Sequence, residues 1–286
     1  MPLVPAARSR TAGCRRQVTD TTRREAGAEM TAGVTAMHSD GTIRPMRSAE
    51  SMLVLAVILL LGLACFYGLR AALEPAGWAS YPAYLASLSV AFVAMLVWAV
   101  AAYLAEGHPR TLRGFLQRVR LEPVGPRVLL WGLGAGVVMF LSTALFSPLL
   151  ARATSAGWLP LPAGIPDYLN PAKQQSLALL KEQFISQGIL PWIPIVLILH
   201  IAAEEIFWRG MVFPRQEVQH GKRTYFVHGL IWAFSHLLQY WMLPPILIGS
   251  LALAWTVQHM RTTWVSVVAH LVNNGLPFTL MLLFFT

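Results

Sequence analysis

Long apolar runs constrain this chain more than any other feature of its sequence. Hydrophobic residues make up 56% of its 286 residues and charged residues only 12%, about half the share that soluble domains carry. A helix of about 20 apolar residues crosses a bilayer with its backbone polar groups satisfied internally. We therefore expect an all-α fold, a polytopic transmembrane helical bundle of about seven spans. The expected spans are 52–69, 81–105, 128–150, 190–212, 225–241, 243–258 and 263–285.

The formal net charge of +9 does not point to nucleic acid, because the basic residues follow the membrane topology. They gather in the N-terminal tail and in alternate loops, chiefly 106–127 and 209–223. Loops rich in Arg and Lys stay in the cytoplasm. Residues 1–50 are rich in Arg and lack apolar periodicity, so we expect a disordered basic cytoplasmic tail. Residues 51–286 would form the transmembrane domain.

Two glycines in the third apolar run indicate a close helix contact. Gly132 and Gly136 are four residues apart, which is the spacing at which small residues let two membrane helices approach each other. We expect a neighbouring helix to pack on this face.

The fourth apolar run carries ionisable residues at a depth where they are costly. Glu205 and Arg209 are four apart in the favourable orientation, so we expect them to pair. Glu204 points about 100° away and shares its face with His200. Glu204 is therefore the carboxylate expected to face a cavity. Such residues are functional candidates by default, and the alternative is a structural ion cluster that ties helices together.

Two later runs carry further polar residues. His236 alone would more often be a hydrogen-bonded packing residue. His270 and Asn274 are four apart, so an α-helix places them on one face, where both can donate hydrogen bonds to an oxyanion. This pair alone can equally be interhelical glue.

Together these residues resemble the motifs of the CPBP family, which includes type II CAAX prenyl proteases and bacteriocin-processing enzymes and is also called the abortive-infection family. The three motifs are Glu204-Glu205-x-x-x-Arg209, Trp232-x-x-x-His236 and His270-x-x-x-Asn274. The family usually has Phe at the first position of the second motif, where this chain has Trp232.

The resemblance implies an intramembrane endopeptidase of helical-bundle fold whose catalytic core lies in residues 190–280. Its partners would be the lipid bilayer and a peptide or membrane-anchored protein substrate, with no nucleic acid, in a bacterial inner membrane. The implied roles are general base for Glu204 with His236 assisting, oxyanion donors for His270 and Asn274, and support for Glu205 and Arg209.

Metal dependence stays open, because the family is described both as metalloproteases and as metal-independent glutamate proteases. We expect no cofactor, with divalent zinc as the alternative. Its ligands would then be Glu204, His236 and His270, since one carboxylate and two imidazoles can hold zinc. Other functions are a non-catalytic membrane partner or assembly protein of the same fold, and a transporter, although no inverted repeat is visible.

Overall fold

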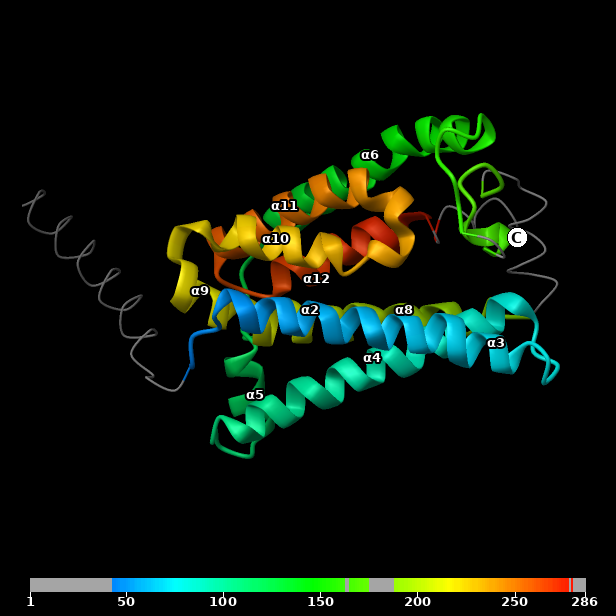
Figure 1. The fold of residues 1–286 in the computed structure, drawn as a ribbon. Coiled ribbons are helices and arrows are strands. Elements are labelled where there is room, and N and C mark those ends of the chain that lie inside the picture. Colours follow the sequence, from blue (N-terminus) through cyan, green and yellow to red (C-terminus); the bar gives the residue numbers. More distant parts are fainter. Residues whose placement is uncertain (1–42, 163–164, 175–187, 278, 280–286) are drawn as a thin grey trace, which may run out of the picture. The chain divides into compact units, whose positions relative to one another are not determined.

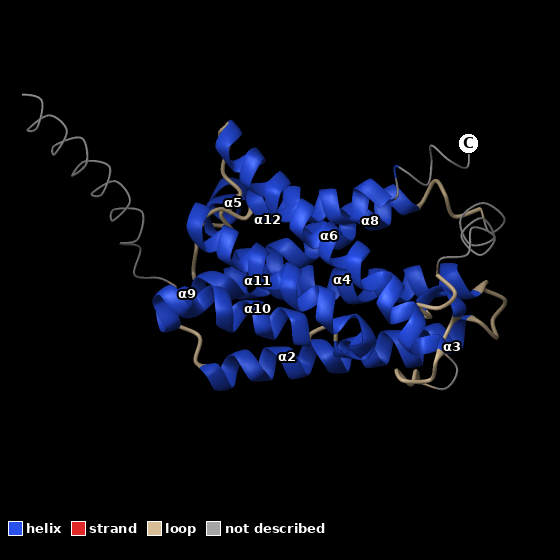
Figure 2. Cartoon of the chain, turned by 90° about the horizontal axis from the view of Figure 1, so that it is seen from above, coloured by secondary structure: helices blue, strands red, loops and turns tan. Residues whose placement is uncertain are grey.

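The computed structural model describes residues 43–162, 165–174, 188–277 and 279. The chain divides into two units, 1–43 and 44–286, and the fold described below is that of the second. Most of the expected disordered tail lies outside the described residues. Within those residues the regular structure is helical and contains no strand, as Figure 2 shows, and this confirms the predicted all-α class.

Within the described residues, four helical stretches are long and apolar enough to cross a membrane: Ser48–Leu73, Ser80–Ala105, Pro126–Ser155 and Leu237–Met260. They correspond to the first, second, third and sixth expected spans. The first consists of α2 (Ser48–Leu63), the π-helical segment η1 (Ala64–Leu69) and α3 (Arg70–Leu73); the next two are α4 and α6; the last joins the 3-10 segment η6 (Leu237–Met242) to α11 (Leu243–Met260).

The other three expected spans also contain helices in the part of the chain that the structure describes. The fourth begins with α8 (Ile193–Glu204) and continues without a break through a π-helical segment, η4 (Glu205–Val212), into α9 (Phe213–His220). The fifth contains α10 (Thr224–Phe234). The seventh contains α12 (Trp264–His270) and a π-helical segment, η7 (Leu271–Gly275). These three contain polar residues or are short within the described residues, so they are not among the four candidate spans. The total of seven spans stays a prediction.

Shorter elements complete the fold. They are α5 (Leu112–Arg118) and the 3-10 segments η2 (Asp167–Leu169) and η5 (Gly221–Arg223). Proline stands in the first turn of α6, α8 and α11, a position that tolerates its missing N–H. Pro214 of α9 follows η4 directly, so the continuous helix lacks one backbone donor there.

The helices of the second unit form two neighbouring groups (Figure 1). One contains α6, α10, α11 and α12, and the other contains α2, α4 and α8. Large aliphatic side chains such as Leu60, Leu130 and Ile198 are exposed on both groups, as expected where a helix faces lipid. The core between the groups is made of closely packed aromatic and small residues, among them Phe207, Trp208, Trp232, Ala203 and Ala269.

The glycines of α6 allow the close contact that their spacing predicts. A Cβ atom at Gly132 would lie 2.6 Å from the Val268 Cβ, and one at Gly136 would lie 2.6 Å from the Val272 Cβ. Gly134, on another face, has nothing within 4 Å. The backbone of α6 therefore lies directly against α12 and η7, the segments that carry His270 and Asn274.

Candidate active site

The first motif lies at the junction of α8 and η4. Glu205 and Arg209 are both fully buried, and the Arg209 Nη1 atom donates to the Glu205 Oε1 atom at 3.1 Å. The predicted pair thus forms even though this stretch is wound as a π-helix. The guanidinium also lies 4.1 Å from the centroid of the Trp232 ring on α10. A buried charge needs such partners, and here they come from two helices.

His270 connects α12 to both carboxylates. Its Nδ1 atom lies 2.9 Å from the Glu205 Oε1 atom, and its Nε2 atom lies 3.9 Å from the Glu204 Oε2 atom. A carboxylate paired with arginine only accepts hydrogen bonds, so the ring proton sits on Nδ1. A neutral His270 therefore presents a lone pair at Nε2. It can donate from Nε2 only as an imidazolium.

Glu204 is the less constrained of the two carboxylates. It is buried, with a relative exposure of 7%, and its Oε2 atom has no hydrogen-bond partner among the described residues. Its Oε1 atom lies 3.5 Å from the Nε2 atom of His200. This confirms the predicted imidazole on the same helix face. The His200 ring stacks on Phe92 of α4 at 4.4 Å and meets the edge of His270 at 5.0 Å.

His236 and Asn274 belong to the second and third motifs, but the described structure shows no polar contact between them and Glu204. Within the described part of the chain, neither makes a hydrogen bond or ion pair with that carboxylate. The His236 Nδ1 atom lies 3.0 Å from the Trp232 carbonyl oxygen, so its Nε2 atom keeps a lone pair. The Asn274 Oδ1 atom accepts a hydrogen bond from Asn273 at 2.8 Å, which leaves the Asn274 amide N–H groups available.

The residues that can hold a cation differ from the set expected from the sequence. One ligand atom each from His200, Glu204 and His270 lies within 4.8 Å of the others. His200 thus stands where we expected His236. The four-residue spacing of His200 and Glu204 was the sequence signal for this grouping.

Trp232, which departs from the Phe usual in the family motif, is a buried contact residue of the site. Its ring faces Arg209 and meets the edges of His236 at 5.0 Å and His270 at 6.2 Å. One aromatic side chain therefore separates and orients three polar residues from different helices.

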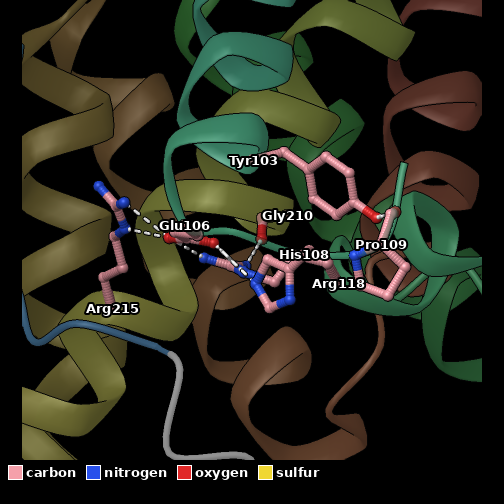
Figure 3. Close-up of polar contacts among 7 residues, drawn as sticks. All are labelled: Tyr103, Glu106, His108, Pro109, Arg118, Gly210 and Arg215. Atoms are coloured by element: carbon pink, nitrogen blue, oxygen red, sulfur yellow. Dashed lines mark hydrogen bonds and ion pairs between the residues drawn. The ribbon is translucent and has the colours of Figure 1, made fainter. Parts of the chain in front are cut away.

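A second polar cluster lies just beyond the end of α4 (Figure 3). The Glu106 carboxylate accepts hydrogen bonds from Arg118 at 2.7 and 2.9 Å, and from Arg215 at 2.8 and 2.6 Å. His108 also contacts it at 3.1 Å. Burial alone would raise the pKa of Glu106, but the hydrogen bonds and charges of the two arginines outweigh it, and the pKa is lowered.

This cluster is connected to the first motif. The Arg118 Nη1 atom donates to the Gly210 carbonyl oxygen at 2.9 Å, one residue after Arg209, as Figure 3 shows. Arg215 belongs to α9, which continues η4. The Glu106 cluster therefore fixes the end of the helix that carries the two carboxylates. The sequence indicated only that this loop is basic.

These features define an integral membrane protein, a helical bundle with a buried carboxylate–imidazole site. Residues 186–276, roughly a third of the chain, match the family model described as Type II CAAX prenyl endopeptidase Rce1-like. This segment holds all three motifs, and the match confirms the resemblance to the CPBP family. The family supports the class of intramembrane endopeptidase. No curated protein and no solved structure was found to match the chain.

Proposed function

We propose that the protein cleaves a peptide bond at the membrane with a water molecule activated by Glu204. The observation that supports this most is the state of that carboxylate. It is buried, one oxygen has no hydrogen-bond partner among the described residues, and imidazoles of His200 and His270 lie at 3.5 and 3.9 Å from its oxygens. A buried carboxylate with an unoccupied lone pair is suited to accept a proton.

In the proposed reaction, Glu204 takes a proton from water and the hydroxide forms a bond to the carbonyl carbon. The proton then passes to the amide nitrogen as the C–N bond breaks. His236 helps to hold the water, because hydrogen bonding of its Nδ1 atom to the Trp232 carbonyl leaves Nε2 as an acceptor. No residue forms a covalent intermediate, and no metal takes part in these steps.

The developing oxyanion would be stabilised by two donors. Asn274 donates from its side-chain amide, whose oxygen is already engaged by Asn273. His270 donates from Nε2 in its imidazolium form, while Nδ1 remains on Glu205. Glu205, held by Arg209, thus supports the reaction by fixing the orientation of the His270 ring.

The proposed substrate is a peptide or membrane-anchored protein presented in the bilayer. We also propose that the N-terminus is cytoplasmic and that the protein resides in a bacterial inner membrane. The distribution of Arg and Lys between alternate loops supports this orientation. The basic loop around Glu106 then lies on the cytoplasmic side, next to the end of the helix that carries the site.

The test is cleavage of a library of membrane-anchored peptides by the full chain, reconstituted in liposomes in water enriched in ¹⁸O. Mass spectrometry should find internal cleavage with the heavy isotope in the new carboxylate. Glu204→Gln should abolish cleavage, whereas the control Glu122→Gln, at a carboxylate outside the site, should not. Equal cleavage by Glu204→Gln and the wild type would show that Glu204 is not the base. A protein that cleaves no peptide but binds membrane proteins would instead be a non-catalytic partner.

A further inference from the structure

We propose that His200, Glu204 and His270 form a binding site for one divalent transition-metal cation such as Zn²⁺. His200 lies outside the three family motifs and has no step in the proposed hydrolysis. The proposal concerns cation binding. It shares Glu204 and His270 with the proposed proteolytic site, but it predicts cation binding whether or not the protein cleaves a peptide.

The distances between the candidate ligand atoms fit a single small cation. Zinc binds imidazole nitrogen and carboxylate oxygen at about 2.0–2.2 Å, so ligand atoms of a tetrahedral site lie about 3.3–3.6 Å apart. The His200 Nε2 atom lies 3.5 Å from the Glu204 Oε1 atom, and the His270 Nε2 atom lies 3.9 Å from the Glu204 Oε2 atom. All three ligand groups lie within 4.8 Å of one another. Of the two distances, the first lies within the tetrahedral range and the second is slightly longer, so a bound cation would draw the ligand atoms closer together.

A second observation points to a ligand at this position. The buried Oε2 atom of Glu204 has no hydrogen-bond partner among the described residues. Buried polar groups are nearly always satisfied, by protein, water or an ion. Together with the imidazoles of His200 and His270, the Glu204 carboxylate makes a set of ligands that suits zinc.

The surroundings orient both imidazoles, and in its neutral form His270 presents the nitrogen that a cation requires. The His270 Nδ1–H group donates to Glu205, and this leaves the Nε2 lone pair directed at Glu204. Histidine ligands in metal sites commonly donate their other ring N–H to a carboxylate in this way. Arg209 in turn holds Glu205. The His200 ring is fixed by stacking on Phe92, with an angle of 12° between the planes.

The cation site and the proposed hydrolytic site share Glu204 and His270, and they differ in their other histidine, which is His200 for the cation and His236 for hydrolysis. In the described structure His236 makes its contacts with Trp232 and Ser235, and it is not part of the three-residue group. Variants at the two histidines therefore distinguish the two proposals. Loss of cleavage in His236→Asn with zinc binding intact would leave both standing.

The experiment is zinc binding by the purified full chain, stripped with a chelator and kept in detergent. Bound Zn²⁺ is counted by plasma mass spectrometry, and its affinity is measured by competition with a chromophoric chelator. We expect one zinc per chain that is lost, or weakened at least tenfold, in His200→Asn and in Glu204→Gln. The matched control His236→Asn should bind within twofold of the wild type. Thermal unfolding verifies that each variant is folded.

A second measurement uses Co²⁺ as a probe, because its visible absorption reports the ligand set directly. The wild-type spectrum should change in His200→Gln and remain unchanged in His236→Asn. The proposal is wrong if the folded wild type binds no zinc, if His200→Asn binds as the wild type does, or if His236→Asn loses the ion. Zinc retained in full by Glu204→Gln would also overturn it, since Glu204 would then not be a ligand.

Discussion

Replacing Gly136 by alanine should force α6 away from the helix that carries His270. The new Cβ atom would lie 2.6 Å from the Val272 Cβ atom and 2.8 Å from the Ala269 carbonyl oxygen. Carbon atoms in contact are about 3.5–4.0 Å apart, so the overlap is about 1 Å. One of the overlapping atoms belongs to the backbone, and rotation of a side chain cannot relieve it.

The effect should appear in both activity and stability. Displacing catalytic groups by about 1 Å can reduce the rate about 100-fold, and overpacking a helix contact costs about 1–3 kcal/mol. We therefore expect kcat/KM for a membrane-anchored peptide to fall about 100-fold, and the midpoint of thermal unfolding in detergent to fall as well. Both quantities can be measured on one preparation.

Gly134→Ala is the matched control, because an added Cβ atom there meets nothing within 4 Å. It should retain wild-type activity and be slightly more stable, since alanine is favoured over glycine in a helix by about 1 kcal/mol. Equal rates and equal unfolding midpoints for Gly136→Ala and Gly134→Ala would refute the close contact between α6 and η7.

Three further predictions concern the polar contacts. Glu106→Gln removes the charge between Arg118 and Arg215 and should destabilise the protein by about 3 kcal/mol in an unfolding titration; an unchanged midpoint would contradict the cluster. The pKa of Glu106 in the fold is lowered below its ordinary value of 4.5. Its contribution to the free energy of unfolding is therefore present above pH 4.5 and is lost as the pH falls through the pKa of the folded state. Acid unfolding should show this loss of stability in the wild type and not in Glu106→Gln. Trp232→Leu removes the aromatic face from Arg209 and should cost about 1–2 kcal/mol, whereas Trp232→Phe should retain part of it; equal stability of the two variants would show that the ring does not interact with the guanidinium.

Contacts between residues near in sequence were predictable. The four-residue spacing of Glu205 and Arg209 predicted their pair, and the same spacing placed His200 beside Glu204. The apolar runs predicted the helices because a bilayer leaves few alternatives for the backbone. The Gly132 and Gly136 spacing predicted a close contact, although not the identity of the helix that supplies it.

Contacts between distant residues were not predictable from spacing. Arg215 is separated from Glu106 by 109 residues, and His270 from Glu205 by 65, so only the packing of helices brings them together. Periodicity also assumes α-helical winding. Two of the π-helical segments, η4 and η7, carry motif residues, and the wider turn changes which side chains share a face. The four-residue spacing of His270 and Asn274 therefore does not by itself place their side chains on one helix face.

The role of Glu204 is tested most directly by single-turnover cleavage with metal-stripped protein. The rate constant for the wild type is compared with that of Glu204→Gln at saturating peptide, and thermal unfolding verifies that both are folded. General-base catalysis is worth about 10²–10⁴-fold, so we expect a loss of at least about 100-fold with peptide binding unchanged. A Glu204→Gln rate within tenfold of the wild type would contradict the proposed chemistry.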